Sequence, residues 1–236
     1  MTRGPSSDDG ATGGSAAGDG PHRVGDEEAR LFVAVWPPAE VVGRLEALER
    51  PERPGVRWTG PDQWHATLRF LGQAPLRRAV DAVAAVRGAV ATVQLGPVTA
   101  RLGRGVLCLP AHGLDELAAA VLLATAAVGR PPQDRPFHGH LTLARAARGG
   151  GRKGRGSGRG GQGALTDLVG AAFSAAFTVG EITLVRSVPG RGGHRYEVVA
   201  AAALEGAGPR PAVPPRAPLT APGESAGGAA GPDGGR

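Results

Sequence analysis

Residues 64–72, WHATLRFLG, and residues 137–145, FHGHLTLAR, decide the fold of this chain, because one short pattern occurs in both. Each stretch has a histidine and a threonine two positions apart in an apolar, β-favouring run: His65 with Thr67, and His140 with Thr142. Alternate side chains of a strand point to the same face. We therefore expect strands at 65–71 and 138–144, each turning its histidine and threonine to one side.

Strict alternation divides the side chains of both strands between a core face and a polar face that lines a cleft. The predicted core set is Trp64, Ala66, Leu68 and Phe70 in the first strand and Phe137, Gly139, Leu141 and Leu143 in the second. The predicted cleft set is His65, Thr67 and Arg69 in the first strand and His138, His140 and Thr142 in the second. Two imidazoles and two hydroxyls would then surround one substrate atom.

The rest of the pattern mixes strands and helices joined by tight turns. Further strands are predicted at 30–36, 94–100, 105–109, 179–186 and 195–202, and helices at 39–49, 75–90, 114–128 and 165–176. Short turns between neighbouring strands favour antiparallel pairing, which indicates an α+β fold rather than a doubly wound sheet. Each motif strand lies in its own strand–helix set, so two lobes are expected to face each other across the cleft.

Composition separates a folded domain from its flanks. Glycine and proline supply 40 and 21 of the 236 residues, which favours long stretches without a packed core. We predict a disordered acidic tail at 1–28, a folded domain at 29–204 and a disordered Pro/Gly/Ala-rich tail at 205–236. A Gly/Arg-rich insertion at 146–163 has five basic residues and no acidic one. It is either a solvated, flexible insertion or an RNA contact driven by charge.

Three further features narrow the class of protein. Cys108 is the single cysteine, so no disulfide forms within the chain, and its apolar surroundings indicate a buried thiol rather than a nucleophile. No apolar run reaches the roughly 18 residues of a membrane span, and no membrane partner is expected. The N-terminus lacks the apolar core of a signal peptide, so a cytoplasmic location is expected.

The paired motifs suit acid–base chemistry on a phosphate. Breaking a phosphodiester needs a proton for the leaving oxygen and a base for the attacking water, and histidine titrates near neutral pH. Threonine hydroxyls can donate to phosphate oxygens, and Arg145 can neutralise a charged transition state. His138 lies either against the substrate or at the rim. His138 with His140 also permits a metal site, but the motif strands hold no carboxylate, so we predict no metal or other cofactor.

The motifs resemble those of the 2H phosphoesterase superfamily, specifically the bacterial RNA 2′,3′-cyclic phosphodiesterases, also called LigT-like or 2′-5′ RNA ligase proteins. The matching stretches are RLFVAVWPP at 30–38, VRWTGPDQWHATLRFLG at 56–72, FHGHLTLAR at 137–145, FTVGEITLVRS at 177–187 and GHRYEVV at 193–199. The resemblance implies two pseudo-twofold-related lobes, each an antiparallel sheet with helices on its outer face. It also implies hydrolysis of RNA 2′,3′-cyclic phosphate ends, such as those of tRNA halves, to 2′-phosphomonoesters.

The resemblance also implies a role for each motif residue. His65 is then the proton donor to the leaving 3′ oxygen, and His140 is the base that activates water. Thr67, Thr142 and Arg145 hold the phosphate oxygens. Alternation alone turns Arg145 away from the cleft, so a bulge or the end of the strand must redirect it.

The second motif region departs from the family pattern. Gly139 stands where the family usually has proline, His138 precedes it, and the insertion at 146–163 is unusual. Three other functions stay open: 2′-5′ RNA ligation in the same cleft, a non-catalytic RNA- or nucleotide-binding module, and a metallohydrolase. The intact histidines and threonines favour catalysis over a retired binding site.

Overall fold

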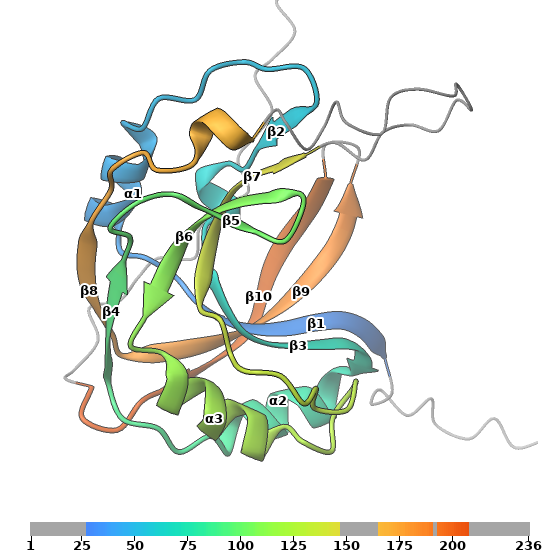
Figure 1. Cartoon of the computed structure of the whole chain (residues 1–236). Helices are drawn as coiled ribbons and strands as arrows, with labels where there is room; N and C mark the ends of the chain where they lie inside the picture. Colours follow the sequence, from blue (N-terminus) through green and yellow to red (C-terminus); the bar gives the residue numbers. More distant parts are fainter. Residues whose placement is uncertain (1–26, 147–164, 191–192, 208–236) are drawn as a thin grey trace, which may run out of the picture.

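The computed structural model describes residues 27–146, 165–190 and 193–207 (Figure 1). The two predicted tails and the Gly/Arg-rich insertion lie outside the described residues, apart from a few residues at their edges. No helix within the described ranges is long and apolar enough to cross a membrane.

The described part of the chain forms strands, three α-helices and two short 3-10 helices. The strands are β1 (Glu28–Val35), β2 (Val56–Trp58), β3 (Ala66–Pro75), β4 (Ala91–Leu95), β5 (Ala100–Leu102), β6 (Val106–His112), β7 (His140–Ala146), β8 (Ala175–Val179), β9 (Glu181–Gly190) and β10 (Gly193–Ala203). The helices are α1 (Ala39–Glu46), α2 (Leu76–Ala84) and α3 (Asp115–Ala124), with 3-10 turns η1 (Pro61–Gln63) and η2 (Thr166–Leu168).

The strands form one continuous path in the order β10-β9-β1-β3-β7-β6-β4-β8, with β2 added beside β7 and β5 beside β6. Every ladder between these strands is antiparallel, which confirms the predicted α+β class with antiparallel pairing. The pairing of β3 with β7 divides the path into two sets of four strands. The two-lobed, pseudo-twofold arrangement of the whole domain stays a prediction.

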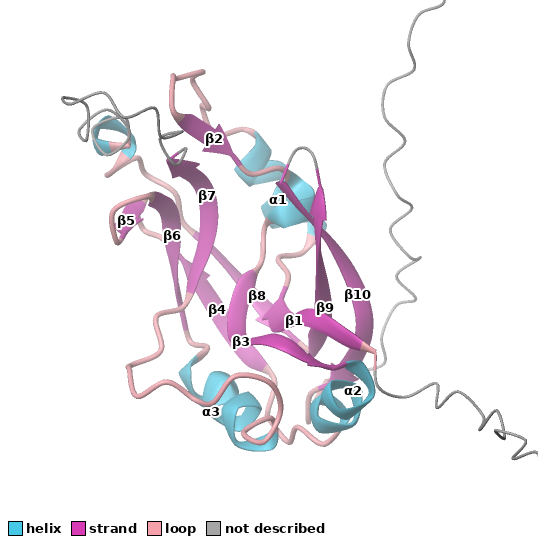
Figure 2. Cartoon of the chain, turned by 90° about the vertical axis from the view of Figure 1, so that its right-hand side faces the viewer, coloured by secondary structure: helices cyan, strands magenta, loops and turns pink. Residues whose placement is uncertain are grey.

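The three α-helices pack against the sheet through the apolar side chains on one face of each helix. α2 and α3 lie side by side at one end of the molecule, and α1 lies away from them (Figure 2). Each helix buries residues three or four positions apart, as an amphipathic helix does. The buried positions include Val41 and Leu45 of α1, Ala79 and Val83 of α2, and Leu117 and Val121 of α3.

Strand β1 is buried on both faces. Leu31, Val33 and Val35 point into the main core. On the opposite face, Phe32 and Ala34 form a small second cluster with Val185, against which Trp36 and Tyr196 pack. This second cluster is built from β1, β9, β10 and the residue that follows β1, and it lies beside the first motif.

One predicted element is wrong. Residues 165–176, expected to be a helix, form the single 3-10 turn η2 and the start of β8. β8 pairs with β4 through five residue pairs from Ala91 with Val179 to Leu95 with Ala175. The tertiary pairing of an edge strand therefore outweighs the helix propensity of the local alanines.

Several predicted boundaries also shift. The strand expected at 94–100 is two strands, because the chain leaves β4 at Leu95 and re-enters a strand at Ala100. The strand expected at 65–71 does not end at Leu71: β3 continues to Pro75 through Gly72, which has a positive φ and pairs with Leu31. The helix expected at 75–90 ends at Ala84, and β7 begins at His140 rather than at 138.

Candidate active site

The two motifs meet at one backbone pairing. Ala66 of β3 pairs antiparallel with Leu141 of β7, and these are the middle residues of the two His-x-Thr sequences. In an antiparallel register, that pair sets His65 beside Thr142 and Thr67 beside His140. We call the sheet surface that carries these four side chains the motif face.

Both motifs continue into a β-bulge at the same position. On β3, Thr67 pairs with Ala34 and Arg69 with Val33, which leaves Leu68 as an extra residue. On β7, Thr142 pairs with Cys108 and Ala144 with Leu107, which leaves Leu143 as an extra residue. A bulge puts two successive side chains on one face and reverses the alternation that follows. The leucine after each threonine is therefore where strict alternation fails.

The bulge on β7 is fixed by Thr59, a buried residue between β2 and η1. The Thr59 hydroxyl lies 2.8 Å from the carbonyl oxygens of Thr142 and Leu143, and its own amide donates to the Leu143 carbonyl at 2.9 Å. The indole N–H of Trp64 donates to the same hydroxyl at 3.1 Å. The residue before His65 is thereby tied to the backbone of the second motif. Trp64 is buried, as the sequence predicts.

His65 directly precedes β3 and is surrounded by aromatic rings. Its imidazole stacks on Phe32 with ring centres 4.9 Å apart, meets Tyr196 edge-on at 5.1 Å and lies 5.1 Å from the Trp36 ring. The Trp36 indole is held in turn by a 2.8 Å hydrogen bond from Nε1 to the hydroxyl of Thr183. His65 Nδ1 is buried and makes no hydrogen bond of ordinary geometry.

This environment lowers the pKa of His65 from 6.5 to about 4. Burial is the main cause, because an apolar environment disfavours the imidazolium ion. A backbone interaction with Gln63 opposes the shift, whereas the positive charges of Arg145 and His140 add to it. His65 is therefore neutral near pH 7 without a ligand. The contributions of Arg145 and His140 also place both groups within electrostatic reach of His65.

His140 has a defined tautomer. Its Nδ1 lies 2.8 Å from the backbone carbonyl oxygen of His138. A carbonyl oxygen only accepts, so Nδ1 carries the hydrogen of the neutral ring and Nε2 keeps a free lone pair. His138 thus reaches the site through its backbone, which orients His140. Whether the His138 side chain contacts a substrate stays a prediction.

Arg145 turns toward the motif face. The extra residue at Leu143 leaves both Leu143 and Ala144 buried, and the next side chain, Arg145, is exposed. Strict alternation would turn Arg145 away from the cleft, and the bulge in the β7 register redirects it. Its electrostatic effect on His65 agrees with this orientation.

Arg69 does not line a cleft, contrary to the prediction from alternation. The Leu68 bulge turns it to the buried side, where it is 7% exposed. Its guanidinium donates to the carbonyls of Leu122 and Arg130 at 3.0 and 2.9 Å and to the hydroxyl of Thr125 at 2.7 Å. Arg69 therefore anchors the end of α3 and the segment after it. The same bulge moves Phe70, expected in the core, to the exposed side.

Gly139 is explained by the neighbouring strand. A Cβ atom at this position would collide with the carbonyl oxygen of Ala111, and the amide of Ala111 donates to the Gly139 carbonyl at 2.9 Å. The close approach of β6 therefore favours glycine here, next to His140.

Four residues that surround the motifs do not stand out in the sequence as site residues. Phe32, Trp36 and Tyr196 enclose His65, and Thr59 fixes the second bulge. The only signal in the sequence is that they lie in the stretches 30–38, 56–72 and 193–199 that carry the family resemblance.

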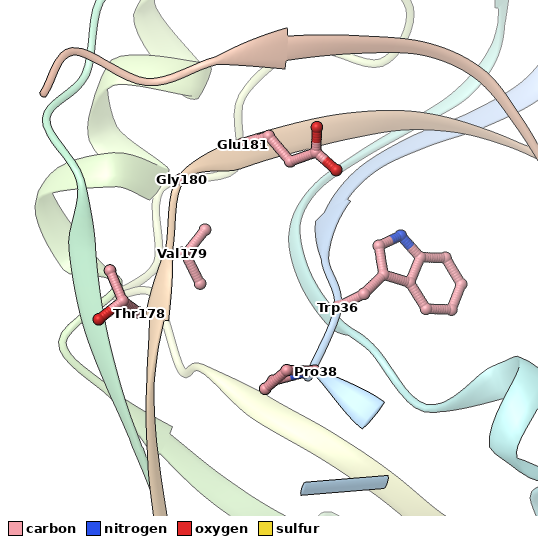
Figure 3. A pocket seen from close by; sticks show the side chains of 6 residues that line it. All are labelled: Trp36, Pro38, Thr178, Val179, Gly180 and Glu181. Carbon is pink, nitrogen blue, oxygen red and sulfur yellow. The ribbon is translucent and has the colours of Figure 1, made fainter. Parts of the chain in front are cut away.

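One cavity lies against the aromatic surroundings of His65. It has a volume of about 180 Å³ and is lined by Trp36, Pro38, Thr178, Val179, Gly180 and Glu181 (Figure 3). Its one charged side chain, Glu181, is acidic and would repel a phosphate. Nowhere in the described ranges, this cavity included, do three His, Cys, Asp or Glu side chains converge as metal ligands would. The motif face, with Arg145, is thus the better place for an anion.

Comparison with known proteins assigns the chain to a family. The family model for LigT-like phosphoesterases matches residues 35–107. An RNA 2′,3′-cyclic phosphodiesterase of Thermus thermophilus is 35% identical over 137 residues, which cover 49% of this chain and 68% of that protein. The chain belongs to the 2H phosphoesterase family. This confirms the resemblance inferred from the motifs.

Solved 2H phosphoesterase structures share the fold. E. coli LigT complexed with 3′-AMP is 28% identical, with a TM-score of 0.58, and the match covers 76% of this chain and 99% of that one. E. coli LigT complexed with phosphate is also 28% identical, with a TM-score of 0.56, and the match covers 75% and 98%. This chain is therefore an enzyme of the 2H phosphoesterase family with a LigT-like, mostly antiparallel sheet.

Proposed function

We propose that this protein hydrolyses RNA 2′,3′-cyclic phosphate ends to 2′-phosphomonoesters, with His65 and His140 as a metal-independent acid–base pair. The observation that carries the proposal is the pairing of Ala66 with Leu141, which joins the two His-x-Thr sequences at their centres. The Thermus relative that bears the name RNA 2′,3′-cyclic phosphodiesterase supports the substrate class.

His140 is the general base in this mechanism. Its Nδ1–H is committed to the His138 carbonyl, so Nε2 is available to take a proton from water. The water oxygen bonds to phosphorus, and the bond from phosphorus to O3′ breaks. The 2′ ester bond stays intact, which yields the 2′-phosphomonoester.

His65 is the general acid that protonates the departing O3′. Its low pKa means that the ligand-free protein does not hold this proton at neutral pH. An anionic phosphate between His65 and Arg145 favours the imidazolium ion, so His65 takes up its proton together with the substrate. The aromatic surroundings keep bulk water away from the acid.

Thr67, Thr142 and Arg145 hold the phosphate. Both threonines are half-buried beside the opposite motif's histidine, where their hydroxyls can donate to non-bridging oxygens. Arg145 adds a fork of N–H donors and a positive charge that favours the more negative transition state. The histidines move protons, and these three side chains neutralise and orient the phosphate.

A product assay tests the proposal. An oligonucleotide with a 2′,3′-cyclic phosphate end is incubated with the protein in the presence and absence of an acceptor with a 5′-hydroxyl. We expect a 2′-phosphate end as the main product. A 3′-phosphate product would contradict the assigned leaving group, a ligated product would favour 2′-5′ RNA ligase activity, and binding without turnover would favour a non-catalytic module.

A further inference from the structure

The hairpin of β9 and β10 meets the segment that leads into the first motif. The side-chain amide of Gln63 donates to the carbonyl of His194 at 2.8 Å. Gly193, which has a positive φ, lies so close to Arg57 that a Cβ atom there would collide with the guanidinium group. Strand β2 and the hairpin ends of β9 and β10 lie at the same end of the molecule (Figure 2). The hairpin therefore forms a wall beside the motifs.

His194 shares the hairpin face that packs on His65. Tyr196, two residues later in β10, meets the His65 ring, and side chains two apart in a strand point to the same face. Ser187 pairs with Tyr196, and its hydroxyl lies 2.9 Å from Nδ1 of His194, a diagonal contact on that face. His194 therefore lies on the motif side of the hairpin, at an exposed position.

Arg57 stands beside Arg145 on the motif face. The two residues pair directly across β2 and β7, so their side chains project to the same side, and both are exposed. Like charges opposite each other repel, and a bound anion offsets that repulsion. Leu141, where the two motifs meet, lies four residues before Arg145 in the chain. Arg57 therefore extends the positive charge beyond the point where the motifs meet.

The chemistry of these two side chains suits a second phosphate group. A guanidinium group offers a planar fork of N–H donors to phosphate oxygens. When the Ser187 hydroxyl donates to Nδ1 of His194, Nε2 carries the ring hydrogen and can donate to a phosphate oxygen too. We call Arg57 and His194 the hairpin subsite. The acid–base mechanism at the motifs uses neither of them.

We propose that the hairpin subsite binds the phosphodiester on the 5′ side of the terminal nucleotide. An RNA with a cyclic phosphate end has no nucleotide beyond that end, so its next phosphate lies 5′ of the terminal ribose. The two strand positions from Tyr196 to His194 span roughly 7 Å, which is on the scale of one nucleotide. This inference rests on the proposed function and makes oligonucleotide ends better substrates than mononucleotides, because it adds a phosphate contact.

The test compares two substrates that differ in one charge. Both are a dinucleotide of two adenosines with a 2′,3′-cyclic phosphate end. One has the ordinary phosphodiester between its nucleosides, and the other has an uncharged methylphosphonate there. Arg57→Gln and His194→Ala each remove one group of the subsite, and Arg57→Lys keeps the positive charge. Arg78→Gln, at an exposed position on α2 at the opposite end of the molecule from β2, is the matched control (Figure 2).

We expect wild type to prefer the phosphodiester, and Arg57→Gln to reduce the ratio of the two kcat/KM values about 10-fold, as for the loss of one hydrogen bond to a charged group. His194→Ala should reduce the ratio as well. Arg57→Lys should keep part of the preference, because lysine keeps the charge but not the planar fork. A ratio unchanged by Arg57→Gln, or lowered equally by Arg78→Gln, would overturn the inference.

A binding measurement separates the hairpin subsite from the proposed function. The ligand is the phosphodiester dinucleotide with a 2′-phosphate end, titrated by calorimetry at several salt concentrations. Arg57→Gln should raise Kd about 10-fold and reduce the slope of log Kd against log salt by about 0.7, the value for one phosphate of a single strand.

That result supports the subsite even if no cyclic phosphate is hydrolysed. A wild type that hydrolyses neither substrate contradicts the proposed function instead. An equal Kd and slope in wild type and Arg57→Gln, or no binding to wild type, would mean that Arg57 does not hold this phosphate.

Discussion

Ala66 and Leu141 are paired neighbours on β3 and β7, and each is the central residue of a His-x-Thr sequence. This one contact brings together two motifs that are far apart in the chain. It also relates them symmetrically, because each is followed by a bulge at the leucine after its threonine. By strand register, this pairing sets two histidines and two threonines side by side on the motif face.

Removing either histidine should abolish most of the turnover. We expect His65→Ala and His140→Ala each to lower kcat for a 2′,3′-cyclic nucleotide by about 10²- to 10⁴-fold, the usual contribution of an acid–base group. Steady-state kinetics measure the effect, and circular dichroism checks that each variant is folded. Wild-type turnover in either variant would contradict the acid–base pair.

Chelation should not reduce activity. The proposed mechanism uses only side chains, so dialysis against EDTA is expected to leave kcat unchanged. The initial rate of hydrolysis before and after dialysis measures this. Loss of activity that added zinc restores would instead favour the metallohydrolase alternative with His138 and His140 as ligands.

His65 should make the fold acid-sensitive. Its pKa is 6.5 when unfolded and about 4 when folded, so between these values the unfolded chain binds a proton that the folded one does not. The free energy of unfolding should therefore decrease as the pH falls through this window. Above the window His65 is neutral in both states, so its titration should not make the free energy of unfolding depend on pH. Urea unfolding at several pH values measures the slope.

The variant His65→Gln provides the comparison for that slope. It lacks the titrating group, so its free energy of unfolding should depend less steeply on pH across the same window. Identical slopes in the two proteins would show that His65 is not buried as a neutral imidazole.

Because the positive charge of Arg145 contributes to the low pKa, Arg145→Ala should raise the pKa of His65, which NMR titration measures directly.

Thr59 should matter for stability and for activity together. Thr59→Val keeps the shape but removes the hydroxyl that binds Trp64 and two carbonyls at the β7 bulge. We expect the free energy of unfolding to fall by about 1–3 kcal/mol, the cost of leaving buried polar groups unpaired. We also expect kcat to fall, because the bulge directs Arg145.

Thr59→Ser is the matched control for that change, since it keeps the hydroxyl. Urea unfolding and steady-state kinetics on both variants separate the two effects. A valine variant as stable and active as the serine variant would mean that the bulge does not depend on this hydroxyl.

The sequence is most informative where a pattern is local. The period-2 runs around His65 and His140 predict motif strands, and the short turns predict antiparallel pairing, because strand alternation and turn geometry are properties of a few neighbouring residues. The alanine-rich stretch at 165–176 is misread as helix because its partner, β4, is remote in the sequence.

The surroundings of the candidate site depend on contacts that no local pattern reveals. Phe32, Trp36 and Tyr196 come from two distant segments, and only their packing around His65 lowers its pKa. The sequence identifies the histidine, but burial decides which protonation state it has.

Arg69 and Arg145, the arginines that follow the two motifs, show most clearly where prediction from the sequence ends and the effect of tertiary structure begins. Side-chain alternation in the sequence predicts the two His-x-Thr strands and the residue types around them. Only the tertiary structure decides that Arg69 turns inward to anchor α3 while Arg145 turns out toward His65. The cause is the extra residue at Leu68 and at Leu143, since a bulge is defined by the register with neighbouring strands and reverses the side chains that directly follow it.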